Sequence, residues 1–290
     1  MSVIIISSLL DPASVNIKNC ILDKSSWDEI DKFSNNPVYK NNHLDDIYLL
    51  TINDRKIFHE NIDKEIKQQL NITPKQAIFI SRHTSKTGKP SLTVHPIGNY
   101  GEAKFGGKQN TLVPCSPKLM TALLRLIKNN LKTSTLDYQV CFEVTHHGPY
   151  LEIPSLFVEV GSTDAEWNNK LPADIIANSL IQLLEKYQYE TDFSDNIPTL
   201  IGFGGGHYAP RFTDVAFEKK AAFGHMIPLY QIKSGNIKYD IFEKAILATP
   251  NFKGVYIHRK SLKKSQVTQT KNILKDNGIC VISSKELEDL

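Results

Sequence analysis

The sequence lacks any close pairing of cysteines. Its four cysteines lie far apart and form no Cys-x-x-Cys pair, so neither a disulfide framework nor a thiolate zinc site is indicated. We interpret them as buried thiols. A metal ion would have to be held by the nine histidines and the carboxylates, and such a nitrogen and oxygen ligand set points to catalysis more than to structural zinc. The cysteines are Cys20, Cys115, Cys141 and Cys280.

Long apolar runs are also lacking. No stretch approaches the roughly 20 apolar residues that a membrane span needs. The apolar stretch 2–10 is too short for a secretory signal and has neither its basic flank nor its cleavage site. We therefore expect a cytosolic protein without a membrane segment.

Internal repeats, low-complexity tracts and linkers are absent as well, which favours a single domain over residues 1–290. With 41% hydrophobic and 22% charged residues, the chain can bury a substantial core. Its net charge of +3 is distributed unevenly. Residues 251–275 carry seven basic residues and no acidic one, so the remainder of the chain carries −4. The C-terminal part is a candidate surface for binding a polyanion.

Short apolar runs alternate with stretches of helical periodicity, and this alternation predicts an α/β fold with a largely parallel sheet. The expected strands are 3–10, 47–52, 77–80, 140–144, 156–160, 199–203, 223–227 and 255–257. The expected helices are 57–70, 116–131, 172–187 and 262–276. Thr163 and Glu166 have the spacing of a capping box.

The longest irregular stretch is 83–117, which is rich in Gly, Pro, Thr and Lys. Loops of this length in compact domains are usually functional or disordered. Because α/β sheets bind ligands beyond the carboxyl ends of their strands, we expect this loop at one rim of the sheet, as an active-site loop.

Two strand-to-loop corners concentrate chemically active residues. In the first, 145–154, His146 and His147 are followed by a Gly-Pro break and by Glu152. Adjacent histidines on a strand would point to opposite faces, so both can serve one site only where the backbone turns. In the second corner, 201–211, a run of glycines leads to His207 and an arginine. We expect both corners to lie at the same rim.

Two carboxylates, Glu143 and Glu159, lie inside apolar strand runs. Burying an unpaired carboxylate costs several kcal/mol, so each should have a cation, a metal ion or several donors as its partner. A plain salt bridge or an exposed edge-strand face would explain them equally well. Glu159, which lies close to the rim at Gly161, is the better functional candidate.

The histidines differ in how strongly they indicate function. His146 and His147, together with Glu152, favour metal binding or acid–base chemistry. His83, His95 and His225 are intermediate. Ordinary core or surface positions explain the others, His43, His59 and His258.

The glycine run 204–206 lacks the Lys-Ser/Thr ending of a P-loop and the spacing of a dinucleotide fingerprint. Backbone amides offered to a developing oxyanion fit it better than a phosphate cradle does. No serine lies in a nucleophile-elbow motif, which argues against a serine hydrolase. In the C-terminal helix, Lys264, Lys271 and Lys275 fall on one stripe, with Arg259 and Lys260 just before it. Such a stripe is usually a solvated face, but here a phosphate backbone is a reasonable partner.

Five motifs in combination resemble the archaeal and plant type of D-aminoacyl-tRNA deacylase. They are Ser-Arg-His-Thr-Ser (81–85), His-Pro-Ile-Gly-Asn (95–99), Thr-His-His-Gly-Pro (145–149), Phe-Val-Glu-Val-Gly-Ser (157–162) and Gly-Gly-Gly-His-Tyr-Ala-Pro-Arg (204–211). The resemblance runs across almost the whole chain. It implies a three-layer α/β fold akin to peptidyl-tRNA hydrolases and phosphorylases, hydrolysis of the ester that joins a D-amino acid to tRNA, and one or two zinc ions.

Under this resemblance we assign roles as hypotheses. A water activated by zinc would attack the ester carbonyl, with His146 or Glu152 as the general base. The expected metal ligands are His83, His147, Glu159 and His207. The residues expected to bind substrate are His95, Asn99, Gly205, Gly206, Tyr208, Arg211 and His225. The residues expected to bind tRNA are Arg259, Lys260, Lys264, Lys271 and Lys275.

Two other functions stay open from the sequence. A metal-dependent peptidase or amidohydrolase acting on a small substrate would need the same metal ligands but no basic helix. A non-catalytic RNA-binding module would leave the histidine corners unexplained. No obligate protein partner is inferred, which is compatible with a monomer.

Overall fold

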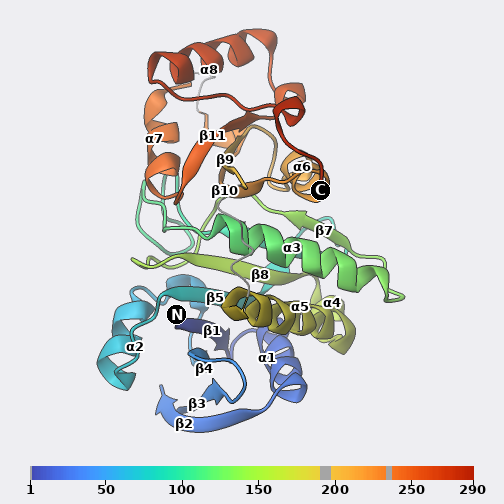
Figure 1. Cartoon of the computed structure of the whole chain (residues 1–290). Coiled ribbons are helices and arrows are strands. Elements are labelled where there is room, and N and C mark those ends of the chain that lie inside the picture. The colour runs from blue at the N-terminus through green and yellow to red at the C-terminus, as the bar shows by residue number, and fades with distance from the viewer. Residues whose placement is uncertain (1, 190–196, 233–236) are drawn as a thin grey trace.

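The structure, a computed structural model, describes residues 2–189, 197–232 and 237–290. A large sheet occupies the N-terminal part of the molecule (Figure 1). In spatial order its strands are β2 (Trp27–Phe33), β3 (Asn36–Asn41), β4 (Ile47–Ile52), β1 (Val3–Ser8), β5 (Gln76–Thr84), β8 (Ser155–Ser162), β6 (Ser91–Pro96) and β7 (Gln139–Phe142). Neighbouring strands are parallel except at β2–β3, β3–β4 and β8–β6.

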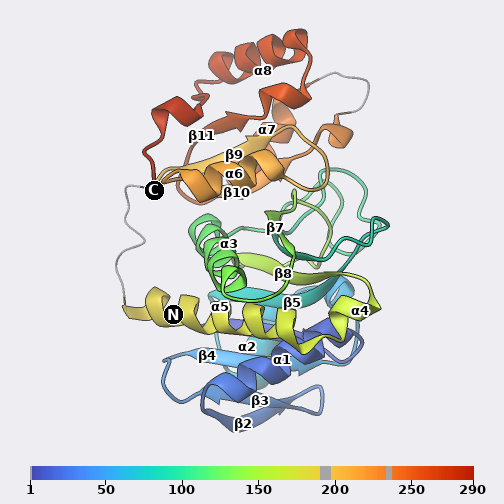
Figure 2. The same cartoon turned by 90° about the vertical axis from the view of Figure 1, so that its right-hand side faces the viewer.

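Helices cover both faces of this sheet. Alternate residues of β1 belong to two different cores: Val3 and Ile5 pack on one face, and Ile4 and Ile6 on the other. Because side chains alternate along a strand, a strand that is buried on both faces needs a layer on each side. The first face packs against α1 (Pro12–Lys24), α3 (Pro117–Lys132) and α5 (Lys170–Tyr189), and the second against α2 (Ile62–Leu70) (Figure 2). The predicted three-layer α/β fold with a mostly parallel sheet is confirmed.

A second, smaller sheet follows in the C-terminal part. Its parallel strands lie in the order β10 (Ala222–Ile227), β9 (Thr199–Phe203) and β11 (Phe252–Ile257). It is accompanied by α6 (Pro210–Glu218), α7 (Tyr239–Leu247) and α8 (Lys264–Asp276). The short helices are η1 (Lys56–Phe58), α4 (Asp164–Trp167), η2 (Leu229–Gln231), η4 (Arg259–Ser261) and η5 (Ser284–Glu286). No helix in the described ranges is long and apolar enough to cross a membrane.

The two sheets meet just beyond the end of β7. The amide of Val144 donates to the carbonyl of His207 at 3.0 Å, and the amide of Thr145 donates to the carbonyl of Met226 at 3.1 Å. The chain after β7 therefore hydrogen-bonds to the loop after β9 and to β10. This junction places segments far apart in the sequence at one site.

Several predicted elements are confirmed, and the structure adds others. The helix that begins after Ser116 is present, and Thr163 forms the capping box with Glu166. The region 57–70 is divided between η1 and a helix that begins only at Ile62. Part of the irregular stretch 83–117 is not a loop, because β6 lies within it and pairs with both β8 and β7.

Candidate active site

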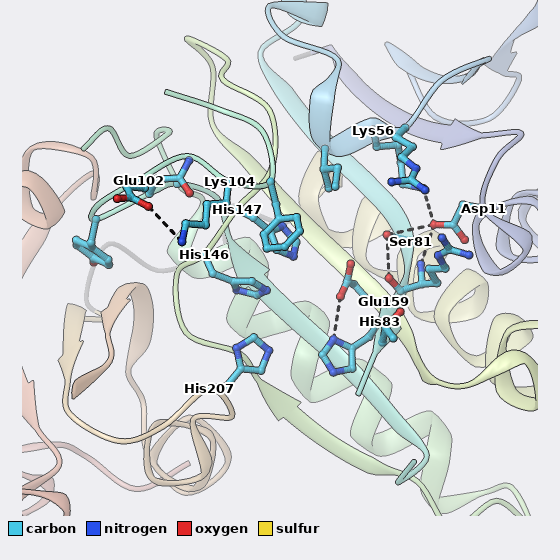
Figure 3. Close-up of a pocket in the computed structure, with 18 of the residues that line it drawn as sticks. Asp11, Lys56, Ser81, His83, Glu102, Lys104, His146, His147, Glu159 and His207 are labelled. Atoms are coloured by element: carbon cyan, nitrogen blue, oxygen red, sulfur yellow. Dashed lines mark hydrogen bonds and ion pairs between the residues drawn. The ribbon is translucent and has the colours of Figure 1, made fainter. Parts of the chain in front are cut away.

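A cavity of about 640 Å³ opens where the two sheets meet. One end is lined by histidines and the other by Asp11, Lys56 and Ser81 (Figure 3). Predicted site residues that line it are His83, Asn99, His146, His147, Glu159 and His207. The loop after His83 and the two histidine corners therefore line one cavity, as expected. This cavity lies between two sheets rather than at one rim of a single sheet, because His207 follows β9 of the second sheet.

Glu143 lies at the centre of the histidine end. It follows β7 directly, and its amide donates to the carbonyl of Val94. Its carboxylate is fully buried and lies 2.7 Å from His207 Nε2, 3.1 Å from His83 Nδ1 and 3.5 Å from His146 Nε2. Within the described part of the chain, neither carboxylate oxygen has a partner in hydrogen-bond geometry. A buried carboxylate in this position needs positive charge nearby, from protonated imidazoles or from a metal ion.

Glu159 supports the cluster from the neighbouring strand. In β8 it lies opposite Ser81 of β5 and Thr93 of β6, and its Oε2 is 3.4 Å from His83 Nδ1. The same oxygen is 3.9 Å from His95 Nε2, which is too far for a hydrogen bond. The sequence analysis required a cation, a metal ion or several donors beside this carboxylate, and in the structure its nearest charged partner is His83.

The two carboxylates and the histidines near them shift each other's pKa. Burial raises the pKa of Glu143 and Glu159, but the neighbouring histidines together, His207 foremost for Glu143 and His83 for Glu159, outweigh burial and leave both pKa values below the ordinary value. Burial lowers the pKa of His83 and His95, but attraction to the carboxylates again outweighs it, and both pKa values are raised. Negative charge is therefore retained at this end of the cavity.

The pKa values of His146 and His147 shift downward, opposite to those of His83 and His95. Burial, reinforced by neighbouring histidines, holds the pKa of His146 far below its usual value and lowers that of His147 to about 4. His146 Nδ1 is 2.7 Å from the carbonyl oxygen of Val144, so this nitrogen carries the proton and Nε2 keeps its lone pair. The neutral form of both rings is therefore favoured, and each ring keeps a lone pair that can bind a metal ion or accept a hydrogen bond.

The donor atoms of the cluster fit a metal ion. Within the described residues, two groups bring three ligand atoms within 4.8 Å of one another: His95, His146 and His147, and His83, Glu143 and His207. Imidazole nitrogens with a carboxylate oxygen suit Zn²⁺. The buried Nε2 of His95, Nδ1 of His147 and both oxygens of Glu143 also lack a hydrogen-bond partner in the described structure.

The structure groups the predicted metal ligands differently from the sequence analysis. His83 and His207 share a group with Glu143 rather than with Glu159, and His147 belongs to the other group. Sequence reasoning did not propose Glu143 as a ligand. Its position inside an apolar run three residues before His146 was the signal that could have found it.

The structure does not bring Glu152 to the cluster. Its side chain is 55% exposed and pairs with Lys64 Nζ at 2.5 Å, while its amide donates to Asp63 on α2. After the break at Gly148 and Pro149 the chain runs away from the histidines, toward α2. Glu152 is therefore not placed to act as a base at this site.

The residues predicted to bind substrate are divided among several places. The ring of His95 lies beside the ring of His146 in the histidine cluster. The hydroxyl of Tyr208 is 3.0 Å from His83 Nε2. Asn99 lines the cavity, but its amide group donates to the carbonyl of Gly106 and so shapes the loop. Arg211 lies elsewhere and donates to Tyr256 and Ser284.

The glycine run connects the histidine cluster with the basic region. The amide of Gly205 donates to Ser261 Oγ at 2.9 Å, and a Cβ on Gly205 would lie 3.3 Å from His258 Nδ1. Gly206 has open space around it. At Gly205 the amide is thus already engaged by η4, and it is not offered to the cavity.

The predicted tRNA-binding residues lie along grooves beside β11 and α8. One groove, of about 940 Å³, is also lined by Arg211 and Tyr256, and it contains Arg259, Lys260, Lys264 and Lys271. A neighbouring groove contains Arg259, Lys271 and Lys275. All five predicted residues therefore gather on one basic surface.

His225 is fully buried, and both nitrogens of its ring form hydrogen bonds within the protein. Its Nε2 donates to the carbonyl of Val113 at 3.0 Å, so its Nδ1 accepts from the hydroxyl of Thr145, also at 3.0 Å. Both nitrogens of the neutral ring are used. Burial lowers the pKa of His225 to about 4, against an ordinary value of 6.5.

This arrangement predicts a pH dependence of stability. Because the folded state favours the neutral ring, the unfolded chain binds more protons between pH 4 and 6.5, and stability falls as the pH drops through that window. Between pH 7 and pH 5 we expect His225 to account for a loss of about 2 kcal/mol in the free energy of unfolding. Urea unfolding of chelator-treated wild type and His225→Gln at the two pH values measures this loss. An identical pH dependence of stability in the two proteins would contradict the prediction.

The fold and the site define an α/β protein with a buried histidine and carboxylate centre suited to a metal ion. Comparison with known proteins identifies the family. Residues 70–282 match the family model of D-aminoacyl-tRNA deacylase, and the chain belongs to this family.

Relatives of similar length agree with this assignment. The chain is 38% identical over 279 residues to D-aminoacyl-tRNA deacylase of Thermococcus onnurineus, covering 95% of this chain and 97% of that protein. It is 34% identical to the protein of the same name from Methanosarcina acetivorans, covering 98% and 93%. A crystal structure of a conserved protein of unknown function superposes with a TM-score of 0.85 at 29% identity, covering 99% and 96%.

Proposed function

We propose that this chain hydrolyses the ester bond of D-aminoacyl-tRNA, releasing the D-amino acid and tRNA, at the histidine and carboxylate end of the cavity. The observation that carries the proposal is Glu143, a fully buried carboxylate within 3.5 Å of three imidazoles in a chain of this family. The cavity of about 640 Å³ is within the size range of small-ligand sites.

His83, Glu143 and His207 would hold a Zn²⁺ ion, and the group of His95, His146 and His147 offers a second set of ligands. A bound Zn²⁺ lowers the pKa of water toward ~7 and polarises a carbonyl oxygen. The hydroxyl of Tyr208, 3.0 Å from His83 Nε2, and Glu159, 3.4 Å from His83 Nδ1, are placed to orient that ring.

The remaining chemistry belongs to the side chains themselves. In hydrolysis, water adds to the ester carbonyl, the bond to the ribose oxygen breaks, and one proton passes from water to that oxygen. His146 suits this proton transfer because its Nε2 has a free lone pair while Val144 fixes the ring through Nδ1.

The basic surface beside α8 would hold the phosphate backbone of tRNA. It lies next to the site through the contact between Gly205 and Ser261 of η4. Its charge comes from a stretch of seven basic residues without an acidic one. This arrangement favours a tRNA substrate over a small one.

The direct test is deacylation of D-tyrosyl-tRNA and L-tyrosyl-tRNA by protein purified without a histidine tag, together with metal analysis. We expect release of D-tyrosine only, and zinc in the protein. Binding of tRNA without turnover would instead support a non-catalytic RNA-binding module. Turnover of small amides or peptides with no activity on either tRNA would support a metal-dependent peptidase or amidohydrolase.

Charge reversal on α8 tests the role of the basic surface. The triple change Lys264→Glu, Lys271→Glu and Lys275→Glu is expected to raise KM for D-aminoacyl-tRNA and leave kcat unchanged. Loss of three phosphate contacts should reduce the slope of log affinity against log salt by about 3. Steady-state kinetics over a range of salt concentrations measures both effects.

The matched control reverses three exposed lysines elsewhere, Lys32, Lys67 and Lys132, and makes the same change in net charge. An equal rise in KM in both triple variants would mean that only the overall charge matters. An unchanged KM in the α8 variant would remove this surface from substrate binding.

A further inference from the structure

The rim of the cavity gathers exposed apolar side chains. Three of the large hydrophobic residues exposed in the described part of the chain line it: Leu10, Phe105 and Tyr230. Phe105 is the most exposed of the three, at 59%. Exposed apolar side chains that cluster at a cavity indicate a ligand surface more strongly than scattered ones do.

Backbone contacts hold Phe105 beside the histidines. Its carbonyl accepts from the amide of Gly148, the residue after His147, at 3.2 Å. The amide of Gly107 donates to Glu60 Oε1 at 2.6 Å. Figure 3 shows the preceding Lys104 and its partner Glu102 on the same side of the cavity as His146 and His147.

The glycines after Phe105 allow this close packing. Gly106 has φ +83°, and a Cβ there would lie 1.4 Å from the carbonyl oxygen of Ile57. The side-chain amide of Asn99 donates to the carbonyl of Gly106 at 2.9 Å. The loop is thus fixed against η1 and against the 95–99 segment, in a position that leaves the phenyl ring uncovered.

Cationic side chains flank the ring in sequence. Lys104 is largely exposed, and Lys108 Nζ lies 3.4 Å from the ring centroid of Tyr150. Exposed aromatic rings with basic neighbours are the means by which proteins hold unpaired nucleotides, because every base can stack on a ring.

We propose that Phe105 is a positioning residue whose ring stacks on the terminal base of the tRNA substrate. This inference rests on the proposed function. The ester on the terminal ribose must reach the histidines deep in the cavity, so the base of that nucleotide lies near the rim. Phe105 lines the same cavity as His146 and His147 and is exposed at that rim.

The experiment compares wild type, Phe105→Ala and Phe105→Tyr on D-tyrosyl-tRNA and D-alanyl-tRNA. Stacking on a base predicts that Phe105→Ala raises KM about tenfold or more for both substrates, with kcat unchanged. Phe105→Tyr, which keeps an aromatic ring, should have the KM of the wild type. The control is Phe58→Ala, since Phe58 is also exposed, at 47%, and does not line the cavity.

A binding measurement that needs no turnover separates this inference from the proposed function. Affinity for uncharged tRNA should fall in Phe105→Ala, and the difference from wild type should vanish for tRNA that lacks its terminal adenosine. An effect confined to D-tyrosyl-tRNA would show that the ring contacts the amino-acid side chain instead, and overturns the inference. An unchanged KM in Phe105→Ala, or a fall in its kcat alone, would also overturn the inference. Inactive wild type with the expected binding pattern would overturn only the proposed function.

Discussion

Replacing Glu143 by Gln is expected to lower kcat/KM for D-aminoacyl-tRNA by about 1000-fold and to remove bound zinc. The substitution keeps the shape of the side chain but takes away the negative charge that three histidines surround. Loss of a charged ligand at a metal centre costs several kcal/mol of transition-state stabilisation, and each 1.4 kcal/mol is a factor of ten. Deacylation kinetics and metal analysis on the same preparation measure the two effects.

The matched control for this substitution is Glu152→Gln. Glu152 is a half-exposed carboxylate that pairs with Lys64 outside the cluster. We expect its kinetics and zinc content to equal those of wild type. If Glu152→Gln were as damaging as Glu143→Gln, the sequence-based assignment of Glu152 as a base would be restored. Full activity in Glu143→Gln would refute the central role given to this carboxylate.

Removal of zinc by a chelator is expected to reduce activity by at least about 100-fold, and stoichiometric Zn²⁺ should restore it. The lost polarisation and water activation amount to several kcal/mol. Mg²⁺ should not substitute, because it prefers oxygen ligands and the described clusters offer mainly imidazole nitrogens.

A thermal measurement accompanies this prediction. Because zinc binds the folded state, adding it back should raise Tm of the metal-free wild type. The same addition should have little effect on Glu143→Gln. Metal-free protein that keeps full activity would contradict the zinc proposal and transfer the chemistry to His146 alone.

The sequence predicted which residues gather at the site, since His83, His146, His147 and His207 all follow or end strand runs. The expected reason, a shared carboxyl edge of one parallel sheet, is wrong, because β7 runs antiparallel to β5 and His207 follows β9 of the second sheet. The structure confirms that they line one cavity. Of the two carboxylates in apolar runs, the sequence analysis preferred Glu159 because it is close to Gly161, whereas the structure surrounds Glu143 with three histidines. The hydrogen bond of Val144 to the carbonyl of His207 brings the loop after β9 to Glu143, and this contact between distant segments is not visible in the sequence.

The other features that the sequence analysis did not predict correctly also have local physical causes. β2 (Trp27–Phe33) carries mostly charged residues because it is an edge strand that is largely exposed, so it has no apolar run. β6 (Ser91–Pro96) mixes polar and apolar residues although all of them are buried, since Thr93 lies opposite Glu159 and His95 lies beside His146. Glu152 is close to His147 in sequence, but the turn at Gly148 and Pro149 sends it toward α2.

The junction between the two sheets has a consequence for how activity responds to partial unfolding. His83 comes from the first sheet and His207 from the loop after the first strand of the second, and both lie within 3.1 Å of the Glu143 carboxylate. The carbonyl of His207 also accepts a hydrogen bond from the amide of Val144 across the junction. Local separation of the sheets would therefore dismantle the centre, and it would also open the part of the first hydrophobic core where Phe142 packs against Phe223. The rate of hydrolysis therefore depends on contact between the two sheets. In mild denaturant we expect this rate to fall before secondary structure is lost.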